Sequence, residues 1–178
     1  MLTYASMLLA GTMVVGQAEK EKADQPEYNP HLKPVAWLIG DWEMKETSPI
    51  GEVKKIRHET WKWAADKSVL LGALTQKNAD GSPDMAGFII YYWDPEKQTI
   101  KCQGHFSGSF GTIIEDHTLV STNGNEQLWD CRFVFPGGNQ GTYHFKLTRD
   151  GDTYAIGWSK ISGAGPQEMG PFVHKRKK

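Results

Sequence analysis

From Asp41 to the C-terminus, the sequence is a series of short segments in which side-chain character alternates with a period of two. Residues 53–63 show this most clearly, because Arg57, Glu59 and Trp61 fall on one face of an extended chain. Glycine, asparagine, aspartate or proline separates each segment from the next, as in the hairpin sequence of residues 78–81. No helix long enough to join parallel strands lies between the segments. The pattern therefore predicts an all-β, antiparallel fold.

The number and spacing of the segments favour a closed up-and-down arrangement. We expect an antiparallel β-barrel of about eight to ten strands, forming one domain. The segment at residues 85–93 is almost entirely apolar, which is typical of a strand buried on both faces. The expected strands are residues 42–47, 53–63, 69–77, 85–93, 99–106, 112–120, 127–135, 141–149, 152–161 and 169–174.

A short helix is expected just before the first strand. Asn29 is a suitable N-cap, Pro30 suits the first helical position, and apolar residues then follow at helical spacing up to Gly40. A helix this short needs tertiary support. We expect it to cap one end of the barrel with Trp37 and Leu38.

The N-terminal segment differs from the rest of the chain. Residues 7–15 are apolar and uncharged, and residues 16–18 place small side chains as a signal-peptidase site requires. A membrane anchor is the alternative, although the apolar stretch is short for a bilayer. We therefore expect a signal peptide at residues 1–18, a linker at 19–29 and one domain at 30–178, with the protein exported to the periplasm or the extracellular space.

The overall charge argues against polyanionic partners. The formal net charge is −1, and the basic run at residues 175–178 reads as a solvated tail. We therefore expect no nucleic-acid partner and no stable membrane insertion after signal cleavage. The oligomeric state stays open.

The two cysteines, Cys102 and Cys131, lie on strands that are not adjacent in a simple meander. That placement argues against a disulfide, although export would permit one. Two buried thiols are the simpler interpretation.

Several short motifs resemble a known group of proteins. Residues 32–42, which include a helical turn ending in Gly-x-Trp, are similar to the start of lipocalin-like (calycin-type) barrels and, more closely, to exported bacterial domains of unknown function. Further matching motifs lie at residues 59–61, 92–95 and 150–154, and the resemblance covers roughly residues 31–176. These motifs are structural, so the resemblance implies a fold and a compartment rather than an activity.

The best candidate function is non-catalytic binding of a small, partly apolar ligand inside the barrel. Aromatic side chains with a few polar groups are typical of such a site, and they are equally typical of a filled core. Arg57 and Glu59 would anchor the polar end of the ligand, or would form a purely structural ion pair. The candidate ligand-binding residues are Arg57, Glu59, Trp61, Trp63, Tyr91, Trp93, Tyr154 and Trp158.

The histidines suggest a second hypothesis, a histidine-dependent enzyme or a haem protein. Their spacing matches no metal motif, and the sequence contains no catalytic motif. His105, His117 and His144 would meet only if their strands brought them together. His174 lies near the position where haem barrels of this general type carry their proximal ligand, although a histidine this close to a charged terminus is usually exposed. We therefore expect no cofactor, with haem as the alternative, and assign no metal ligands or catalytic residues.

A third hypothesis is a protein-interaction module with a filled barrel. The glycine-rich stretch at residues 107–111 would then provide an open sheet edge for a partner.

Overall fold

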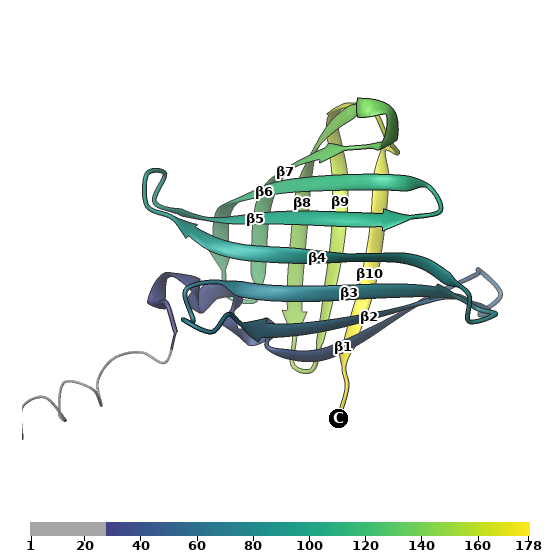
Figure 1. The fold of residues 1–178 in the computed structure, drawn as a ribbon, viewed down its shortest axis with the longest axis horizontal. Coiled ribbons are helices and arrows are strands. Elements are labelled where there is room, and N and C mark those ends of the chain that lie inside the picture. Colours follow the sequence, from purple (N-terminus) through teal and green to yellow (C-terminus); the bar gives the residue numbers. More distant parts are fainter. Residues whose placement is uncertain (1–27) are drawn as a thin grey trace, which may run out of the picture.

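Residues 28–178 of the computed structural model form a closed barrel of ten antiparallel strands (Figure 1). Each strand pairs with its neighbours in sequence, and β10 pairs with β1 to close the barrel, so the expected all-β up-and-down barrel is confirmed. The proposed signal peptide and nearly all of the proposed linker lie outside the described residues. The strands are β1 (Gly40–Thr47), β2 (Val53–Trp63), β3 (Leu70–Asn78), β4 (Pro83–Asp94), β5 (Thr99–Gly108), β6 (Gly111–Asn123), β7 (Glu126–Val134), β8 (Gln140–Asp150), β9 (Thr153–Gly163) and β10 (Glu168–Arg176).

Closure leaves none of the ten strands as a free edge. The expected open edge at residues 107–111 is wrong, because this stretch is the hairpin between β5 and β6. β5 also pairs along its length with β4, and β6 pairs with β7. The backbone groups that an added strand would need are therefore already used inside the barrel.

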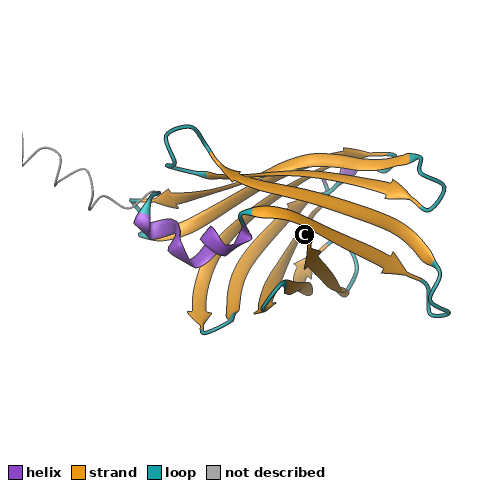
Figure 2. Ribbon diagram, turned by 90° about the horizontal axis from the view of Figure 1, so that it is seen from below, coloured by secondary structure: helices purple, strands orange, loops and turns teal. Residues whose placement is uncertain are grey.

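The 3-10 helix η1 (Pro30–Leu38) lies across one end of the barrel (Figure 2), and a short 3-10 turn, η2 (Pro136–Gly138), joins β7 to β8. The side chain of Asn29 accepts a hydrogen bond from the backbone N–H of His31, as expected for an N-cap. Pro34 lies inside the helix and lacks the N–H that a continuous α-helix would use. Gly40 does not end the helix as expected but begins β1, with φ of 120°. Within residues 28–178, no helix is long and apolar enough to cross a membrane.

The helix is fixed to the barrel by Trp42 and Arg176. Trp42 is fully buried, and its Nε1 donates a 2.7 Å hydrogen bond to the carbonyl of Leu38. The Arg176 guanidinium lies 4.2 Å from the centre of the Trp42 ring and donates hydrogen bonds to the carbonyls of Ile39 (2.6 Å) and Trp37 (2.8 Å). These bonds satisfy carbonyl groups that the end of a helix leaves unpaired. The first and last strands thus hold the end cap together.

We expect Arg176→Gln to lower the free energy of unfolding by about 2 kcal/mol, because it removes two charged hydrogen bonds and a cation–π contact. Lys175→Gln is the matched control, since Lys175 is exposed on the same strand and should change stability by less than about 0.5 kcal/mol. Urea unfolding of the two variants measures the difference. Equal stabilities would show that Arg176 does not hold the cap.

β4 is buried on one face only, whereas the sequence predicted burial on both faces. Tyr91 is buried on the inner face, but Phe88 on the outer face is 49% exposed. The apolar run therefore does not mark a strand covered on both sides, because this wall of the barrel is a single sheet with solvent outside. Phe88 covers part of its ring by stacking on His105 of β5, with ring centres 5.2 Å apart.

Candidate functional site

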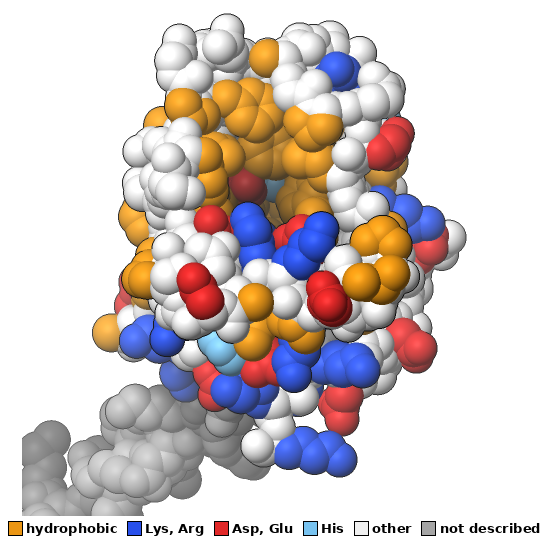
Figure 3. All heavy atoms as spheres, turned by 90° about the vertical axis from the view of Figure 1, so that its right-hand side faces the viewer, with side chains coloured by type: hydrophobic (Ala, Val, Ile, Leu, Met, Phe, Trp, Pro, Cys, Tyr) orange, Lys and Arg blue, Asp and Glu red, His pale blue; other side chains and the backbone are white. Residues whose placement is uncertain are grey.

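The barrel encloses a cavity of about 200 Å³. Leu38 of η1 lies in its lining, and the cavity opens at the other end of the barrel, where Figure 3 shows an apolar hollow with basic side chains along its rim. Most of the lining is aromatic or aliphatic. Its charged or imidazole side chains are Arg57, Glu59, Glu115 and His117.

Six of the eight candidate ligand-binding residues line this cavity. They come from strands β2, β4 and β9, which lie on different sides of the barrel. For β2, period-two alternation predicted that Arg57, Glu59 and Trp61 share one face, and the structure shows that this is the inner face. These six residues are Arg57, Glu59, Trp61, Tyr91, Tyr154 and Trp158.

Trp63 and Trp93 lie elsewhere, at the capped end of the barrel. Trp63 stacks on Tyr28 with ring centres 4.8 Å apart, and Trp93 stacks on His31 with ring centres 4.1 Å apart. Both expected contacts with a ligand are therefore replaced by contacts with the segment that closes the barrel. Alternation identifies the face of a strand on which a residue lies, but not its depth along the barrel axis.

Sequence reasoning missed two polar residues of the cavity, Glu115 and His117 of β6. They follow Ile113, which also lines the cavity, at a spacing of two residues on the same face of β6. The period-two pattern was therefore present in the sequence. Charged residues in a strand usually mark the solvent face, and the neighbouring Asp116 made both faces of this strand look polar. The inner face could be recognised only after the pairing with β5 and β7 was known.

Glu59 is a buried carboxylate whose two oxygens are both engaged. Its Oε2 accepts hydrogen bonds from the Tyr154 hydroxyl and, at 3.1 Å, from Trp61 Nε1. Its Oε1 lies 3.2 Å from Nε2 of His174, the distance of an ion pair, although the N–H is not well aligned with it. The side chains of Glu59 and His174 are 4% and 0% exposed. Glu59 therefore links β2, β9 and β10 and has no oxygen left for a ligand.

The surroundings of Glu59 change its acidity. Burial alone raises the pKa, but the nearby charges of His174 and Arg57 and the hydrogen bond from the Tyr154 hydroxyl together lower it from 4.5 to about 2. The carboxylate is therefore ionised across the physiological range.

This shift predicts how stability depends on pH. A carboxylate whose pKa is lower in the folded protein stabilises the fold above its ordinary pKa of 4.5, and this contribution is lost as the pH falls through about 2. The loss is on the order of 3 kcal/mol. Urea unfolding of the wild type and Glu59→Gln between these pH values should show a steeper loss in the wild type. Parallel curves would contradict the shift.

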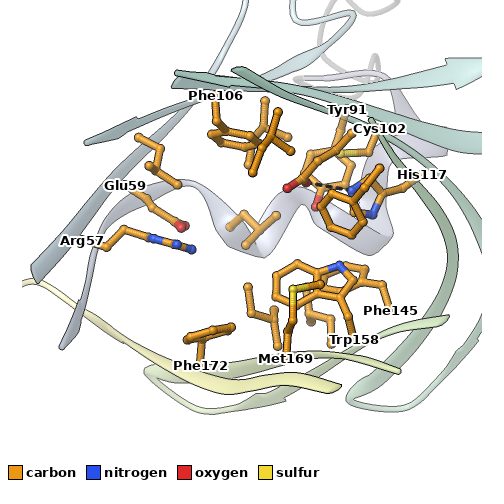
Figure 4. A pocket seen from close by; sticks show the side chains of 18 of the residues that line it. Arg57, Glu59, Tyr91, Cys102, Phe106, His117, Phe145, Trp158, Met169 and Phe172 are labelled. Carbon is orange, nitrogen blue, oxygen red and sulfur yellow. Dashed lines mark hydrogen bonds and ion pairs between the residues drawn. The ribbon is translucent and has the colours of Figure 1, made fainter. Parts of the chain in front are cut away.

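Arg57 is the cavity cation without a carboxylate partner. Its Nε donates a 2.9 Å hydrogen bond to Gln76, whose side-chain amide donates in turn to Asp84. Asp84 forms its ion pair with Lys55 at 3.1 Å, and Arg57 forms no ion pair within residues 28–178. The expected Arg57–Glu59 ion pair is thus absent from the described part of the chain. Figure 4 shows the side chain of Arg57 directed into the cavity, opposite the ring of Phe172, whose centre lies 5.8 Å from the guanidinium carbon.

Across the cavity, His117 connects Glu115 to a buried thiol. His117 Nε2 lies 2.9 Å from Oε2 of Glu115 and 3.3 Å from Sγ of Cys131. Because a carboxylate only accepts, this nitrogen carries the proton. Cys131 of β7 and Cys102 of β5 are both free thiols, separated by β6, which supports the two-thiol interpretation. Burial raises the pKa of each thiol, so both stay protonated and are poor nucleophiles.

The other histidines do not gather in the cavity. His105 and His144 lie on exposed outer positions, so the strands do not bring them together with His117. His174 is buried rather than exposed, and it lies behind Glu59 and Tyr154 instead of lining the cavity. Among residues 28–178, no group of three or more histidine, cysteine, aspartate or glutamate side chains is placed to hold a metal ion. His174, the residue considered as a haem ligand, does not line the cavity, so the residues present do not fit a haem bound through it.

The fold and cavity define a small antiparallel β-barrel with a hollow interior. A solved structure of similar fold is the crystal structure of Rv2717c from M. tuberculosis, with a TM-score of 0.56 and 15% sequence identity over 85% of this chain and 100% of that one. At this identity the likeness shows the fold alone. No protein-family model and no curated protein matches the sequence.

Proposed function

We propose that this protein is an exported, non-catalytic binding protein for a small, largely apolar acid, which it holds inside the barrel. The observation that most strongly supports the proposal is that Arg57 forms no ion pair within residues 28–178. It is the one arginine or lysine in the cavity lining of the described chain, and no carboxylate there lies within ion-pairing distance of it. The rest of the lining is mainly apolar.

The chemistry of Arg57 favours an anionic ligand group. A guanidinium offers several N–H donors in a fixed plane and binds a carboxylate through two parallel hydrogen bonds. With Nε held by Gln76, the remaining nitrogens keep one orientation. A ligand acid would supply a direct ion-pair partner for Arg57, and its apolar part would gain roughly 25 cal/mol for each Å² removed from water.

The size of the cavity limits the ligand. An apolar cavity of about 150 Å³ accommodates benzene, whereas typical drug-sized ligands occupy roughly 300–1,000 Å³. At about 200 Å³, this cavity fits a single aromatic ring or a short chain with one acid group. Long-chain lipids are larger than the space available.

We also propose that the protein is a lipocalin-like, calycin-type barrel. The Gly-x-Trp sequence at residues 40–42 supports this, together with the packing of Arg176 on Trp42 at the capped end. Export is supported by the pattern of residues 1–18. Both would be compatible with a carrier or sensor of small molecules outside the cytoplasm.

The test is calorimetric titration with benzoate and a small panel of single-ring and short-chain carboxylic acids. We expect Arg57→Gln to weaken binding about ten- to hundredfold, because charged hydrogen bonds contribute roughly 1.5–3 kcal/mol. Arg132→Gln, which changes an exposed arginine on the outer face of β7, is the control and should bind like the wild type. Equal affinities for Arg57→Gln and the wild type, or no binding of any acid, would refute the proposal.

A further inference from the structure

We infer that the ligand also carries a hydrogen-bond donor at the end opposite its acid group, and that Glu115 accepts a hydrogen bond from it. This inference rests on the proposed function, because it assumes that Arg57 binds the acid. The class of ligand is then a single-ring aromatic acid with a hydroxyl group. The inference rests on two polar side chains, Arg57 and Glu115, that lie on opposite walls of the cavity with an apolar space between them.

The first observation is a carboxylate oxygen without a partner. Glu115 Oε2 is taken by His117, but Oε1 has no hydrogen-bond partner within residues 28–178. The side chain is only 15% exposed and lines the cavity. This differs from Glu59, the other carboxylate in the lining, whose Oε2 accepts two hydrogen bonds and whose Oε1 lies 3.2 Å from His174 Nε2.

The second observation is the fixed orientation of the Glu115–His117 pair. His117 is packed edge-to-face against Phe145 and Phe133, with ring centres 5.2 and 6.2 Å from its own. Its Nε2 is also held beside Cys131, and its side chain is 4% exposed. Since His117 cannot turn freely, it holds Oε2 of the carboxylate in place, and Oε1 stays without a hydrogen-bond partner on a side chain that lines the cavity.

The third observation is the separation of the two anchors. Figure 4 shows Arg57 on the β2 side of the cavity and His117 on the opposite side, with Trp158, Phe145 and Phe172 forming the wall between them. Trp158 and Phe145 are themselves stacked, with ring centres 5.1 Å apart. A ligand that spans the cavity therefore meets a cation at one end, aromatic faces in the middle and an acceptor at the other end.

The unpaired Oε1 of Glu115 makes the site selective for ligands that carry a hydrogen-bond donor at this position. A ligand that places only carbon or fluorine against Glu115 removes water from the carboxylate without replacing its hydrogen bond. Sites built to bind a hydroxyl discriminate strongly against analogues that lack it, because the polar group of the protein is left unpaired. A hydroxylated acid avoids that cost.

The test compares 4-hydroxybenzoate with 4-fluorobenzoate, which has a similar shape and no donor. In calorimetric titrations, we expect the full-length wild type to bind the hydroxylated acid at least about tenfold more tightly. Glu115→Met should remove this preference and leave the affinity for 4-fluorobenzoate within about threefold of wild type. Asp116→Asn is the control, since Asp116 points away from the cavity to pair with Lys101, and it should keep the preference.

The outcomes separate this inference from the proposed function. A wild-type preference below about threefold, or a preference that survives in Glu115→Met, would overturn the role of Glu115. If 4-fluorobenzoate still binds in an Arg57-dependent way in that case, the proposed function stands alone. If neither acid binds the wild type, both fail together. The wild-type comparison needs no variant, so it remains decisive even if Glu115→Met does not fold.

Discussion

Replacing Glu59 by leucine is expected to lower the free energy of unfolding by about 3–5 kcal/mol. The change leaves the Tyr154 hydroxyl and the Trp61 indole N–H without their acceptor in a buried site, and it removes the carboxylate beside His174. Each unpaired buried donor costs roughly 1–3 kcal/mol, and the new apolar contacts offset only part of this. Urea unfolding at neutral pH measures the loss, and Glu59→Gln, which keeps one acceptor oxygen, should fall between leucine and wild type.

A matched control for Glu59 exists on the neighbouring strand. Glu43 of β1 lies 3.6 Å from His58 on the outer face of the barrel, where both side chains are partly exposed. Because exposed ion pairs contribute little, Glu43→Leu should change stability by less than about 1 kcal/mol. If the Glu59 and Glu43 variants lost the same stability, the buried network would not hold β2, β9 and β10 together.

Trp42→Ala is also expected to lower the free energy of unfolding strongly, by about 4 kcal/mol. The indole is fully buried, touches Tyr154 and Arg176, and donates a hydrogen bond to Leu38. Alanine leaves a cavity at the junction of η1 with the barrel and also frees the Arg176 guanidinium from its ring. Thermal unfolding measures the loss.

Trp42→Phe separates packing from the hydrogen bond. Phenylalanine fills most of the space but cannot donate to Leu38, so its cost should be about 1–2 kcal/mol. A Trp42→Ala variant as stable as Trp42→Phe would contradict the role given to indole packing.

The course of the chain could be predicted from the sequence because its signals are local. Alternation in residues 53–63 and turn residues such as 78–81 each act over a few positions. The helix type was harder, because Pro34 decides between α and 3-10 geometry only together with the packing of the cap. Closure of the barrel depends on pairing between β1 and β10, at opposite ends of the described chain.

The candidate site likewise combines features that local sequence signals predict with features that depend on residues far apart in the chain. Arg57, Glu59 and Trp61 could be placed on one shared face from alternation alone, and the structure shows that this face lines the cavity. The partner of Glu59 could not be predicted, since His174 lies on the last strand and approaches only when the barrel closes. For the same reason, the sequence could not show that Arg57 lacks a counter-charge, although this feature carries the proposed function.

The most direct test of the central claim is native mass spectrometry of the full-length protein, purified without denaturants from its own organism and then incubated with single-ring acids. The account predicts a non-covalent adduct of one small acid that disappears on denaturation and is strongly reduced in Arg57→Gln. A bare protein mass in the presence of excess acid, or an adduct equally abundant in Arg57→Gln, would contradict it.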